Sequence, residues 1–488
     1  TVSELAARLH LSRDQVDATM QRLEASGQVL RGQFREASFV KRAATDSPRS
    51  APSTQHSALS GAGAPEWCHR RLLARIHRLT IGILRKEVEP VTASEFMGFL
   101  LHWQHVVPGS RQHGEAGLQL VIGQLAGFEA AASAWEPQLL RSRIAKYEPE
   151  LLDRLCLSGA VCWGRLSPHP RLSQSGDTDR RRIIPTSTAP ISLFPRDDSE
   201  WLMNAVWGET TTALAEPSSQ LSPIAQDLHR VLTQQGASFF NDLVRITHHL
   251  PTEVEQGLWE LVAAGFATAD GFDNLRSLMD PHRRRAEGRE RARRPRHAAG
   301  RWSLLRGTEP LMVDGQWSSG PDQAISHQPS AIGSSTSTQH STLSAQVAHQ
   351  LLRRYGVVFR DLLARESLVQ SWRDLLVQYR RMEMAGEVRG GRFVSGFTGE
   401  QFALPEAVEA LRAIRKASGA SSHEIKLSAT DPLNLAGVIL PGPRVPAVPT
   451  NFLVLKDGVV VRAVVGRHGD GLLAVTEPFD SATVERSI

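Results

Sequence analysis

The sequence predicts an α+β fold built from repeated modules, each combining helices with a short strand hairpin, followed by a β-rich C-terminal segment. Three observations predict this class. The chain has 488 residues, more than a single hydrophobic core usually organises. A motif that ends a helix recurs four times along it, and its last part is rich in proline and β-branched residues. Several modules are therefore expected.

The recurring motif has a small residue and a glycine between apolar positions. It reads LEASGQV, LCLSGAV, LVAAGFA and MEMAGEV at 23–29, 155–161, 261–267 and 382–388. Glycine there can take the left-handed conformation that ends a helix before a strand begins. A helix that runs into a hairpin in this way is typical of a winged-helix module, so we expect four of them. Whether a fifth precedes the chain or is hidden in it stays open.

The first module is expected to be incomplete. Ser12 and Gln15 have the spacing of a capping box at the start of a second helix, and the chain leaves no room for the helix that normally precedes such a pair. We therefore expect a partial winged helix at 1–41 and a chain cut from a longer polypeptide. Residues 42–66 are rich in Ser, Ala, Pro and Gly, which predicts a flexible linker there.

The remaining modules are expected to be joined by disordered linkers. In order, we expect a helical segment plus winged helix with a β connector at 67–215, a winged helix at 216–279, an Arg-rich then Ser-rich linker at 280–346, a winged helix at 347–420 and a small β-barrel at 421–488. The barrel is predicted because prolines oppose helix there and Asp457-Gly458 indicates a tight hairpin turn.

The stretch MEMAGEVRGGRFVSGFTGEQFALPEAV, at 382–408, resembles a Gly-rich phosphate loop at first sight. It contains no lysine, which such a loop needs, so its glycines are assigned to chain geometry. Gly386 is expected to end a helix, Gly390 and Gly391 to form the wing turn, and Pro405 to start the next helix.

Several classes of protein are disfavoured by missing motifs. No lysine follows a glycine, so GxxxxGK[ST] is absent, and HExxH and GxSxG are absent too. We therefore expect no cofactor and no metal in this chain. Three cysteines are too few for a disulfide framework, which favours buried thiols in a reducing cytoplasm. The most apolar stretch, at 117–135, carries Gln119, Gln124 and Glu129, which argues against a membrane span.

Arginine dominates the basic residues, since only six of the 56 are lysine. Guanidinium groups suit phosphates, so nucleic acid is a reasonable partner, although codon bias in a GC-rich genome is an alternative cause. The candidates lie at a helix start, in an arginine run and at a wing: Arg13, Gln15, Arg283, Arg284, Arg285, Arg389 and Arg392. The alternative for each is a solvated surface residue on a module that serves as a packing scaffold.

Several long strings resemble one family. EWCHRRLLARIHRLTIGILRKEVEPVTASEFMGFLLHWQHV at 66–106, YEPELLDRLCLSGAVCWGRL at 147–166, GRWSLL at 300–305 and DPLNLAGVILPGPRVPA at 431–447 are similar to the region downstream of the motor in Lhr, the large helicase-related proteins of superfamily 2. The resemblance implies a bacterial, cytoplasmic, ATP-dependent 3′-to-5′ helicase involved in DNA repair, with an array of winged helices and a terminal barrel.

The resemblance also implies partners. Single-stranded or tailed duplex DNA or RNA is expected to bind, and the chain is expected to assemble with itself as a homotetramer. ATP and Mg²⁺ would belong to the helicase core, which is missing from this chain. Such arrays also resemble winged-helix DNA glycosylases, and uracil removal is associated with some family members. Asp470 and Asp480 are then the candidate catalytic acids, with solvated loop carboxylates as the alternative.

Overall fold

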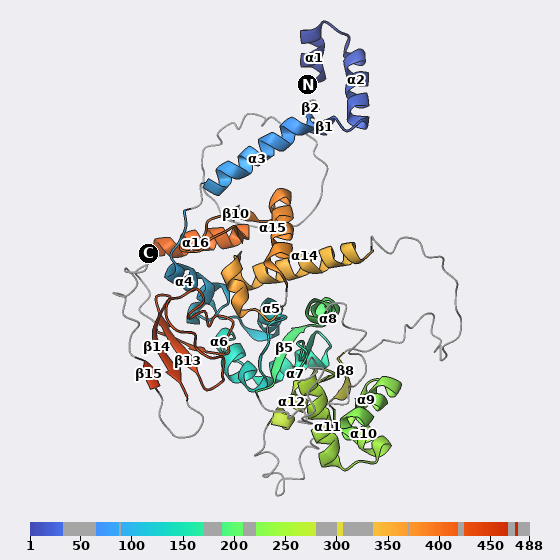
Figure 1. The fold of residues 1–488 in the computed structure, drawn as a ribbon, viewed down its shortest axis with the longest axis vertical. Helices are drawn as coiled ribbons and strands as arrows, with labels where there is room; N and C mark the ends of the chain where they lie inside the picture. The colour runs from blue at the N-terminus through green and yellow to red at the C-terminus, as the bar shows by residue number, and fades with distance from the viewer. Residues whose placement is uncertain are drawn as a thin grey trace, which may run out of the picture. The chain divides into compact units, whose positions relative to one another are not determined.

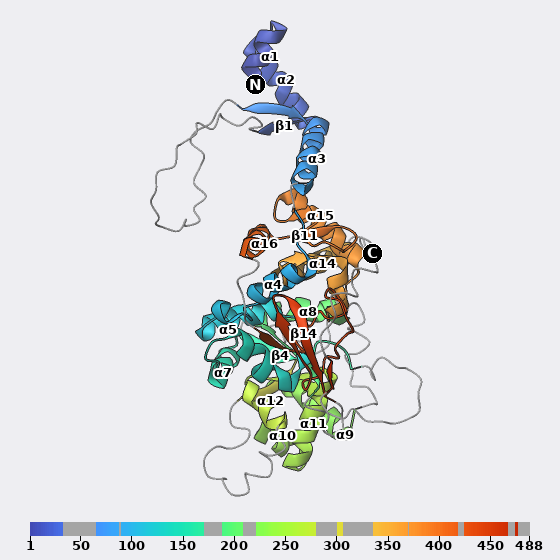
Figure 2. The ribbon, with the colours of Figure 1, turned by 90° about the vertical axis from the view of Figure 1, so that its left-hand side faces the viewer.

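The computed structural model describes the chain over residues 1–32, 65–86, 89–169, 188–207, 221–279, 300–305, 335–368, 370–417, 424–466 and 474–476. Its residues cluster into two compact units, Thr1–Val88 and Glu89–Ile488. The elements of each unit can be followed from two directions in Figure 1 and Figure 2. Each unit is described by itself.

The first unit is a helix pair, a two-stranded sheet and a third helix. Its elements are α1 (Val2–Leu9), α2 (Arg13–Ala25), β1 (Val29–Gly32), β2 (Glu66–His69) and α3 (Arg70–Lys86). The predicted capping box of α2 is confirmed, because Ser12 and Gln15 exchange side-chain bonds with each other's backbone N–H. Strands β1 and β2 pair antiparallel, with Gly32 opposite Glu66. The predicted boundary between a linker at 42–66 and a new module at 67 is therefore wrong, because β2 closes the hairpin of the first unit.

The second unit begins with a module whose helices cover a three-stranded sheet. Its elements are α4 (Ala93–Trp103), α5 (Gly114–Leu125), β3 (Ala130–Ala131), a π-helical turn (Trp135–Leu140), α6 (Arg141–Arg143), α7 (Pro149–Leu157), β4 (Val161–Gly164), β5 (Pro190–Pro195) and α8 (Ser199–Trp207). The strand order is β3-β5-β4, and every pair is antiparallel. Strands β4 and β5 pair antiparallel, and β5 lies within the range for which a β connector was predicted.

The next module has the helix and strand order of a winged helix. Its elements are α9 (Pro223–Gln235), β6 (Ser238–Phe239), α10 (Phe240–Thr247), α11 (Pro251–Ala264), β7 (Ala267–Ala269), α12 (Phe272–Met279) and β8 (Arg301–Leu304). Strand β8 pairs with both β6 and β7. The expected linker at 280–346 is thus wrong in two places: β8 belongs to this module, and the long helix α14 (Ser335–Tyr355) starts inside the predicted range.

The last winged helix follows from α14. Its other elements are β9 (Val357–Val358), a 3₁₀ helix (Arg360–Arg365), α15 (Trp372–Ala385), β10 (Arg389–Gly391), β11 (Gln401–Ala403) and α16 (Pro405–Ala417). The helix start at Pro405 is confirmed. The predicted wing turn is wrong, because Gly390 lies within β10 opposite Phe402 and Gly391 ends that strand. Gly396 and Gly399, with φ of 87° and 96°, take the left-handed backbone in the connection instead.

The helix-ending glycines behave as predicted in all four modules. Gly27, Gly159, Gly265 and Gly386 have φ between 71° and 89°, and each follows its helix by one or two residues. Only glycine takes this backbone conformation without a steric penalty, and the chain then turns into β1, β4, β7 or β10. The repeated motif thus marks the same structural junction four times.

The C-terminal segment forms a sheet. Strands β12 (Ile425–Ser428), β13 (Phe452–Lys456), β14 (Val459–Val465) and β15 (Ala474–Thr476) pair antiparallel in chain order. The predicted turn at Asp457-Gly458 is confirmed, since both residues have positive φ. Among the described residues the sheet stays open, with β12 and β15 as its two edges, so the predicted closed barrel is not found.

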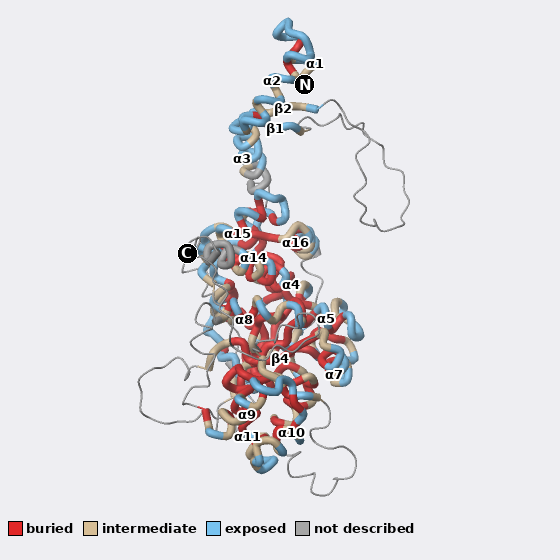
Figure 3. Tube along the Cα trace, turned by 90° about the vertical axis from the view of Figure 1, so that its right-hand side faces the viewer, coloured by how far each residue is buried: buried red, intermediate tan, exposed pale blue. Residues whose placement is uncertain are grey.

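One continuous hydrophobic core serves two modules. Buried side chains from Leu118 to Trp302 form a single cluster, and Trp163 of β4 meets both Phe272 and Trp302 edge to face. Figure 3 shows the buried residues concentrated where these modules meet within the second unit. The predicted α+β class with winged-helix modules is therefore confirmed. In the part of the chain that the structure describes, no helix is both long and apolar enough to cross a membrane.

Candidate nucleic-acid interface

The two residues predicted to contact nucleic acid at the start of α2, Arg13 and Gln15, differ in whether their side chains are already hydrogen-bonded. Arg13 is the first residue of α2 and is exposed, and it makes no ion pair with a described residue. Gln15 is also exposed, but its Oε1 accepts a hydrogen bond from Ser12 N at 3.2 Å. Gln15 therefore serves first as a helix cap, and Arg13 remains the candidate for a phosphate contact at this position.

The predicted wing arginines are free. Arg389 lies in β10 opposite Ala403, and Arg392 follows the strand. Both are exposed, and neither side chain makes a hydrogen bond or ion pair with a described residue. Guanidinium groups in this state can bind phosphate oxygens without first breaking an intramolecular pair.

Helix α3 adds an arginine face in the first unit. Arg70, Arg71, Arg75 and Arg78 all lie on one side of it at helical spacing, and all four are exposed. None of their side chains makes an ion pair with a described residue.

Helix α11 of the third module is enclosed over most of its length. Every residue from Gly257 to Gly265 is buried, and Leu258, Leu261 and Val262 are fully buried. Pro251 and Thr252, in its first turn, are exposed. The enclosed part of the helix packs within its own module, as the alternative of a packing scaffold expects, and the first turn is the part that remains open to solvent.

A pocket of about 760 Å³ lies in the second unit, between the first and last of its winged-helix modules. Five segments line it: Trp103 and His105; Leu120 and Gln124; Asp197, Asp198 and Trp201; Gln346, His349, Gln350, Leu352 and Arg353; and Leu404 and Glu406. Aromatic, amide, acidic and basic side chains thus converge on one hollow. Its volume falls in the range of small-molecule sites.

Hydrogen bonds hold one wall of the pocket. Gln124 Nε2 donates to Trp103 O at 3.0 Å and to Arg353 O at 3.3 Å, and Trp103 Nε1 donates to Arg353 O at 3.1 Å. Since two carbonyls fix the amide nitrogen of Gln124, its Oε1 must face the other way, and it has no donor. Trp103 is held in place by these bonds, and the residue remains partly exposed.

A second tryptophan and acidic residues also line the pocket. Trp201 Nε1 donates to Asp198 Oδ1 at 2.9 Å, which orients the ring. Burial lowers the pKa of His105, an effect that the Ser110 carbonyl partly offsets, so this ring is neutral at pH 7. Positive charge in the pocket is therefore supplied by the exposed Arg353.

The pocket lies next to the wing. His349, which lines it, has its Nε2 4.0 Å from Glu387 Oε2, and Glu387 is two residues before Arg389. His349 and Glu387 thus connect the pocket lined by Trp103 and Trp201 to the chain that leads into the wing with Arg389. This combination suits an unpaired nucleic-acid strand, whose bases are free to stack on side chains.

Five of the predicted site residues lie outside the part of the chain that the structure describes, and the pocket was not predicted from the sequence. Arg283, Arg284 and Arg285, and the candidate acids Asp470 and Asp480, lie outside the described residues. The pocket was missed because its parts are remote in sequence: Trp103 and Arg353 are 250 residues apart. Neither residue lies in a local sequence motif, so only their contact in the folded chain reveals the pocket.

Comparison with known proteins identifies two of the modules. Residues 91–181 and 337–423 match the domain families described as "Large helicase-related protein, winged-helix domain", the third and fourth of that array respectively. The first segment contributes α4, α5 and β4, and the second contributes most of α14 with α15 and the wing.

Two curated proteins are similar along most of the chain. One is "Lhr helicase/ probable uracil glycosylase" of Mycolicibacterium smegmatis, 29% identical over 91% of this chain and 26% of its own length. The other is "Lhr helicase/uracil glycosylase" of Escherichia coli, 27% identical over 84% of this chain and 26% of its own length. The chain thus spans about a quarter of these relatives. Two of its segments match winged-helix domains of the large helicase-related protein family, and most of its length is similar to these two Lhr helicases.

Proposed function

We propose that this chain is the nucleic-acid-binding and self-associating C-terminal region of an Lhr-type, ATP-dependent helicase that acts in DNA repair in the bacterial cytoplasm. ATP and Mg²⁺ would be used by the helicase core, and the winged-helix array would hold the strand. The observation that carries the proposal is the pocket with two tryptophans, near a wing whose Arg389 and Arg392 make no ion pair with a described residue.

Binding is tested by fluorescence anisotropy with a labelled single-stranded oligonucleotide. The double variant R389Q/R392Q removes two phosphate contacts, so the slope of log affinity against log salt should fall by about 1.4 for a single strand. R230Q/R245Q is the matched control, because it also removes two exposed arginines, each already paired with an aspartate. An unchanged salt slope in R389Q/R392Q would show that the wing does not contact the strand.

The pocket has its own test. W201A should weaken single-strand binding by roughly fivefold to a hundredfold, which is the usual effect of losing one base-stacking ring. The salt slope should stay as in the wild type, because no phosphate contact is removed. A variant that binds as tightly as the wild type would contradict a stacking role for this tryptophan.

Self-association is supported by the face of α3 opposite its arginines. Leu72, Ile76 and Leu79 recur at helical spacing and are 52%, 48% and 59% exposed. An apolar stripe of this kind is unusual on a surface that contacts only water, and a second copy of the chain could cover it. Light scattering should report a tetramer for the wild type and smaller species for L72E/L79E. A wild type that is monomeric at micromolar concentration would refute self-association.

A DNA glycosylase is the second candidate, because the names of both relatives include uracil glycosylase. Incubation with a uracil-containing single strand, followed by alkali to cleave abasic sites, tests it. Strand breaks above a heat-inactivated control are expected if the chain removes uracil, and D470N and D480N would then locate the acid. No breaks above the control would eliminate this candidate.

A further inference from the structure

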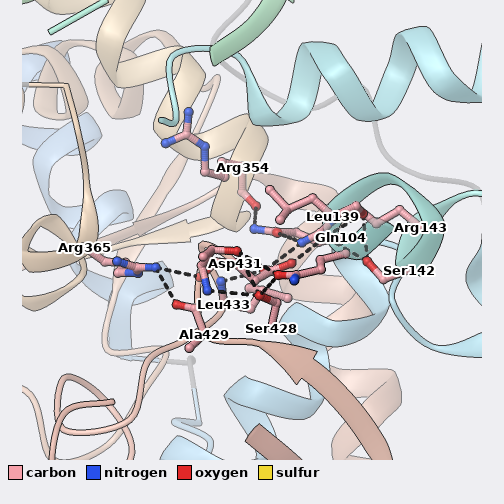
Figure 4. Close-up of polar contacts among 12 residues, drawn as sticks. Gln104, Leu139, Ser142, Arg143, Arg354, Arg365, Ser428, Ala429, Asp431 and Leu433 are labelled. Atoms are coloured by element: carbon pink, nitrogen blue, oxygen red, sulfur yellow. Dashed lines mark hydrogen bonds and ion pairs between the residues drawn. The ribbon is translucent and has the colours of Figure 1, made fainter. Parts of the chain in front are cut away.

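Three arginines meet inside the second unit, where both matched modules contact the C-terminal sheet segment. Arg143 donates from Nη1 and Nη2 to the two carboxylate oxygens of Asp431, at 2.7 Å and 2.9 Å. Arg354 is paired with Glu366, and both of these side chains are fully buried. Figure 4 shows Arg143 and Arg365 reaching the segment around Asp431 from different elements, whereas the side chain of Arg354 points away from it and its backbone carbonyl accepts a hydrogen bond from Gln104.

The third arginine has no carboxylate. Arg365 Nη2 donates to Ala429 O and Asp431 O, each at 3.0 Å, and no described acid lies within ion-pair distance of the guanidinium. Its Nε is buried without an acceptor, and Nη1 makes no hydrogen bond to a described residue. Burial lowers the pKa of the Arg365 guanidinium, although Asp431 and Glu366 act in the opposite direction.

The two acids nearest to Arg365 in sequence and space are each matched by another arginine, Asp431 by Arg143 and Glu366 by Arg354. A charge withdrawn from water is stabilised by a counter-ion or by strong hydrogen bonds, and two backbone carbonyls supply part of that for Arg365. The guanidinium of Arg365 therefore keeps hydrogen-bond capacity for a further acceptor.

Arg365 also lines a pocket that can hold one. The pocket has a volume of about 340 Å³ and is bounded by small, apolar and hydroxyl-bearing side chains: Ala130, Ala131, Thr188, Pro190, Thr430, Ala447, Val448 and Pro449. Glu129 is the other charged residue in its lining, and Glu129 Oε1 accepts the backbone N–H groups of Leu166 and Ser167 at 2.7 Å and 3.0 Å. The carboxylate of Glu129 is thereby engaged by the chain's own backbone.

We propose that this pocket is an anion site in which Arg365 binds a phosphate group. A guanidinium with unused N–H donors, enclosed on one side and open to a small cavity, binds phosphate oxygens through charge-assisted hydrogen bonds. The cavity is at the small end of ligand sites and accommodates a phosphate with the sugar that carries it. The source is either free phosphate or the terminal phosphate of a nucleic-acid strand, and the same chemistry serves both.

Binding is measured on the whole chain with inorganic phosphate, by calorimetry and by the melting temperature, against chloride at equal ionic strength. Phosphate should bind the wild type and raise its melting temperature. R365Q should weaken binding about tenfold or more. R365Q also removes the bonds to Ala429 O and Asp431 O, so a second variant, A447W, is needed. Ala447 is exposed and lines the pocket, so a tryptophan there fills the cavity and leaves the bonds of Arg365 in place.

R444Q is the matched control, since Arg444 is an exposed arginine near the same loop and does not line the pocket. It should bind phosphate like the wild type. Phosphate binding that survives unchanged in both R365Q and A447W, or a wild type that does not bind millimolar phosphate, would overturn the proposal.

A second arm separates the two sources. Oligonucleotides with and without a 5′-phosphate are compared on the wild type and on A447W. A preference for the phosphorylated strand that A447W abolishes assigns the site to a strand end, and equal affinities together with binding of inorganic phosphate assign it to free phosphate. The wing variant R389Q/R392Q should still bind inorganic phosphate, so the failure of the nucleic-acid proposal and the failure of this one are distinguishable.

Discussion

Replacing Asp431 by alanine should lower the free energy of unfolding of the second unit by about 4 kcal/mol. The carboxylate accepts three hydrogen bonds, from Arg143 Nη1 and Nη2 and from Leu433 N, and the side chains of the pair are 0% and 1% exposed. Removing one partner of such a pair costs about 3–5 kcal/mol, because it leaves a buried charge without compensation. The orphaned Leu433 N–H adds about 1 kcal/mol. The bond from Arg143 Nη2 to Gln104 Oε1, at 2.9 Å, offsets part of this loss.

The measurement is urea unfolding followed by tryptophan fluorescence. E115A is the control, since Glu115 pairs with Arg154 while both side chains stay about half exposed, and its loss should cost less than about 1 kcal/mol. A double variant, R143M/D431L, removes both charges and should recover much of the stability, because apolar replacements of buried pairs are close to neutral. The reasoning fails if D431A unfolds within about 1 kcal/mol of the wild type, or if the double variant is no more stable than the single one.

Three further outcomes follow from burial and backbone geometry. Cys68 is partly exposed and should react with a thiol reagent in the native protein. Cys156 and Cys162 are buried, and burial raises the pKa of the Cys156 thiol to about 12, so both should react only after unfolding. Mass spectrometry counts the labels. Burial lowers the pKa of His229 below its unfolded value near 6.5. The contribution of this histidine to stability is therefore present above that pH and is lost as the pH falls toward the folded pKa. In urea melts, H229Q should lose less stability than the wild type between pH 7.5 and 5.5. G458A should be strongly destabilised, because a Cβ there would lie 1.9 Å from the backbone oxygen of Ser94 in a left-handed turn; a melting temperature equal to that of the wild type would contradict the close approach of β13–β14 to α4.

Features that depend on neighbours in the sequence were predictable. The cap formed by Ser12 and Gln15, the helix end at Gly386 and the turn at Asp457-Gly458 each follow from the conformational preference of a few adjacent residues. The winged-helix class followed from the repetition of one such junction. Arg389 and Arg392 were placed on the wing correctly for the same reason, although the glycines assigned to the turn were the wrong ones.

Features that depend on remote pairing were not predictable. Gly32 pairs with Glu66 and Ala269 with Trp302 across segments whose composition indicated linkers, so composition alone misplaced the ends of two modules. The two-tryptophan pocket and the unmatched charge of Arg365 arise only when distant elements pack together. Burial and the number of available counter-charges, which decide the chemistry of both places, have no signature in a single stretch of sequence.

The pairing of β7 with β8 has a practical consequence for the continuity of the polypeptide. The two strands are joined by hydrogen bonds, and Trp302 is buried in the same core as Phe272, so the parts of the chain before Met279 and after Gly300 hold each other by non-covalent contacts. A single cut between these residues should therefore yield two fragments that stay together through gel filtration and separate only in denaturant. The same position is suited to inserting a tag or a second protein, since the fold does not need the covalent link there to bring its two ends together.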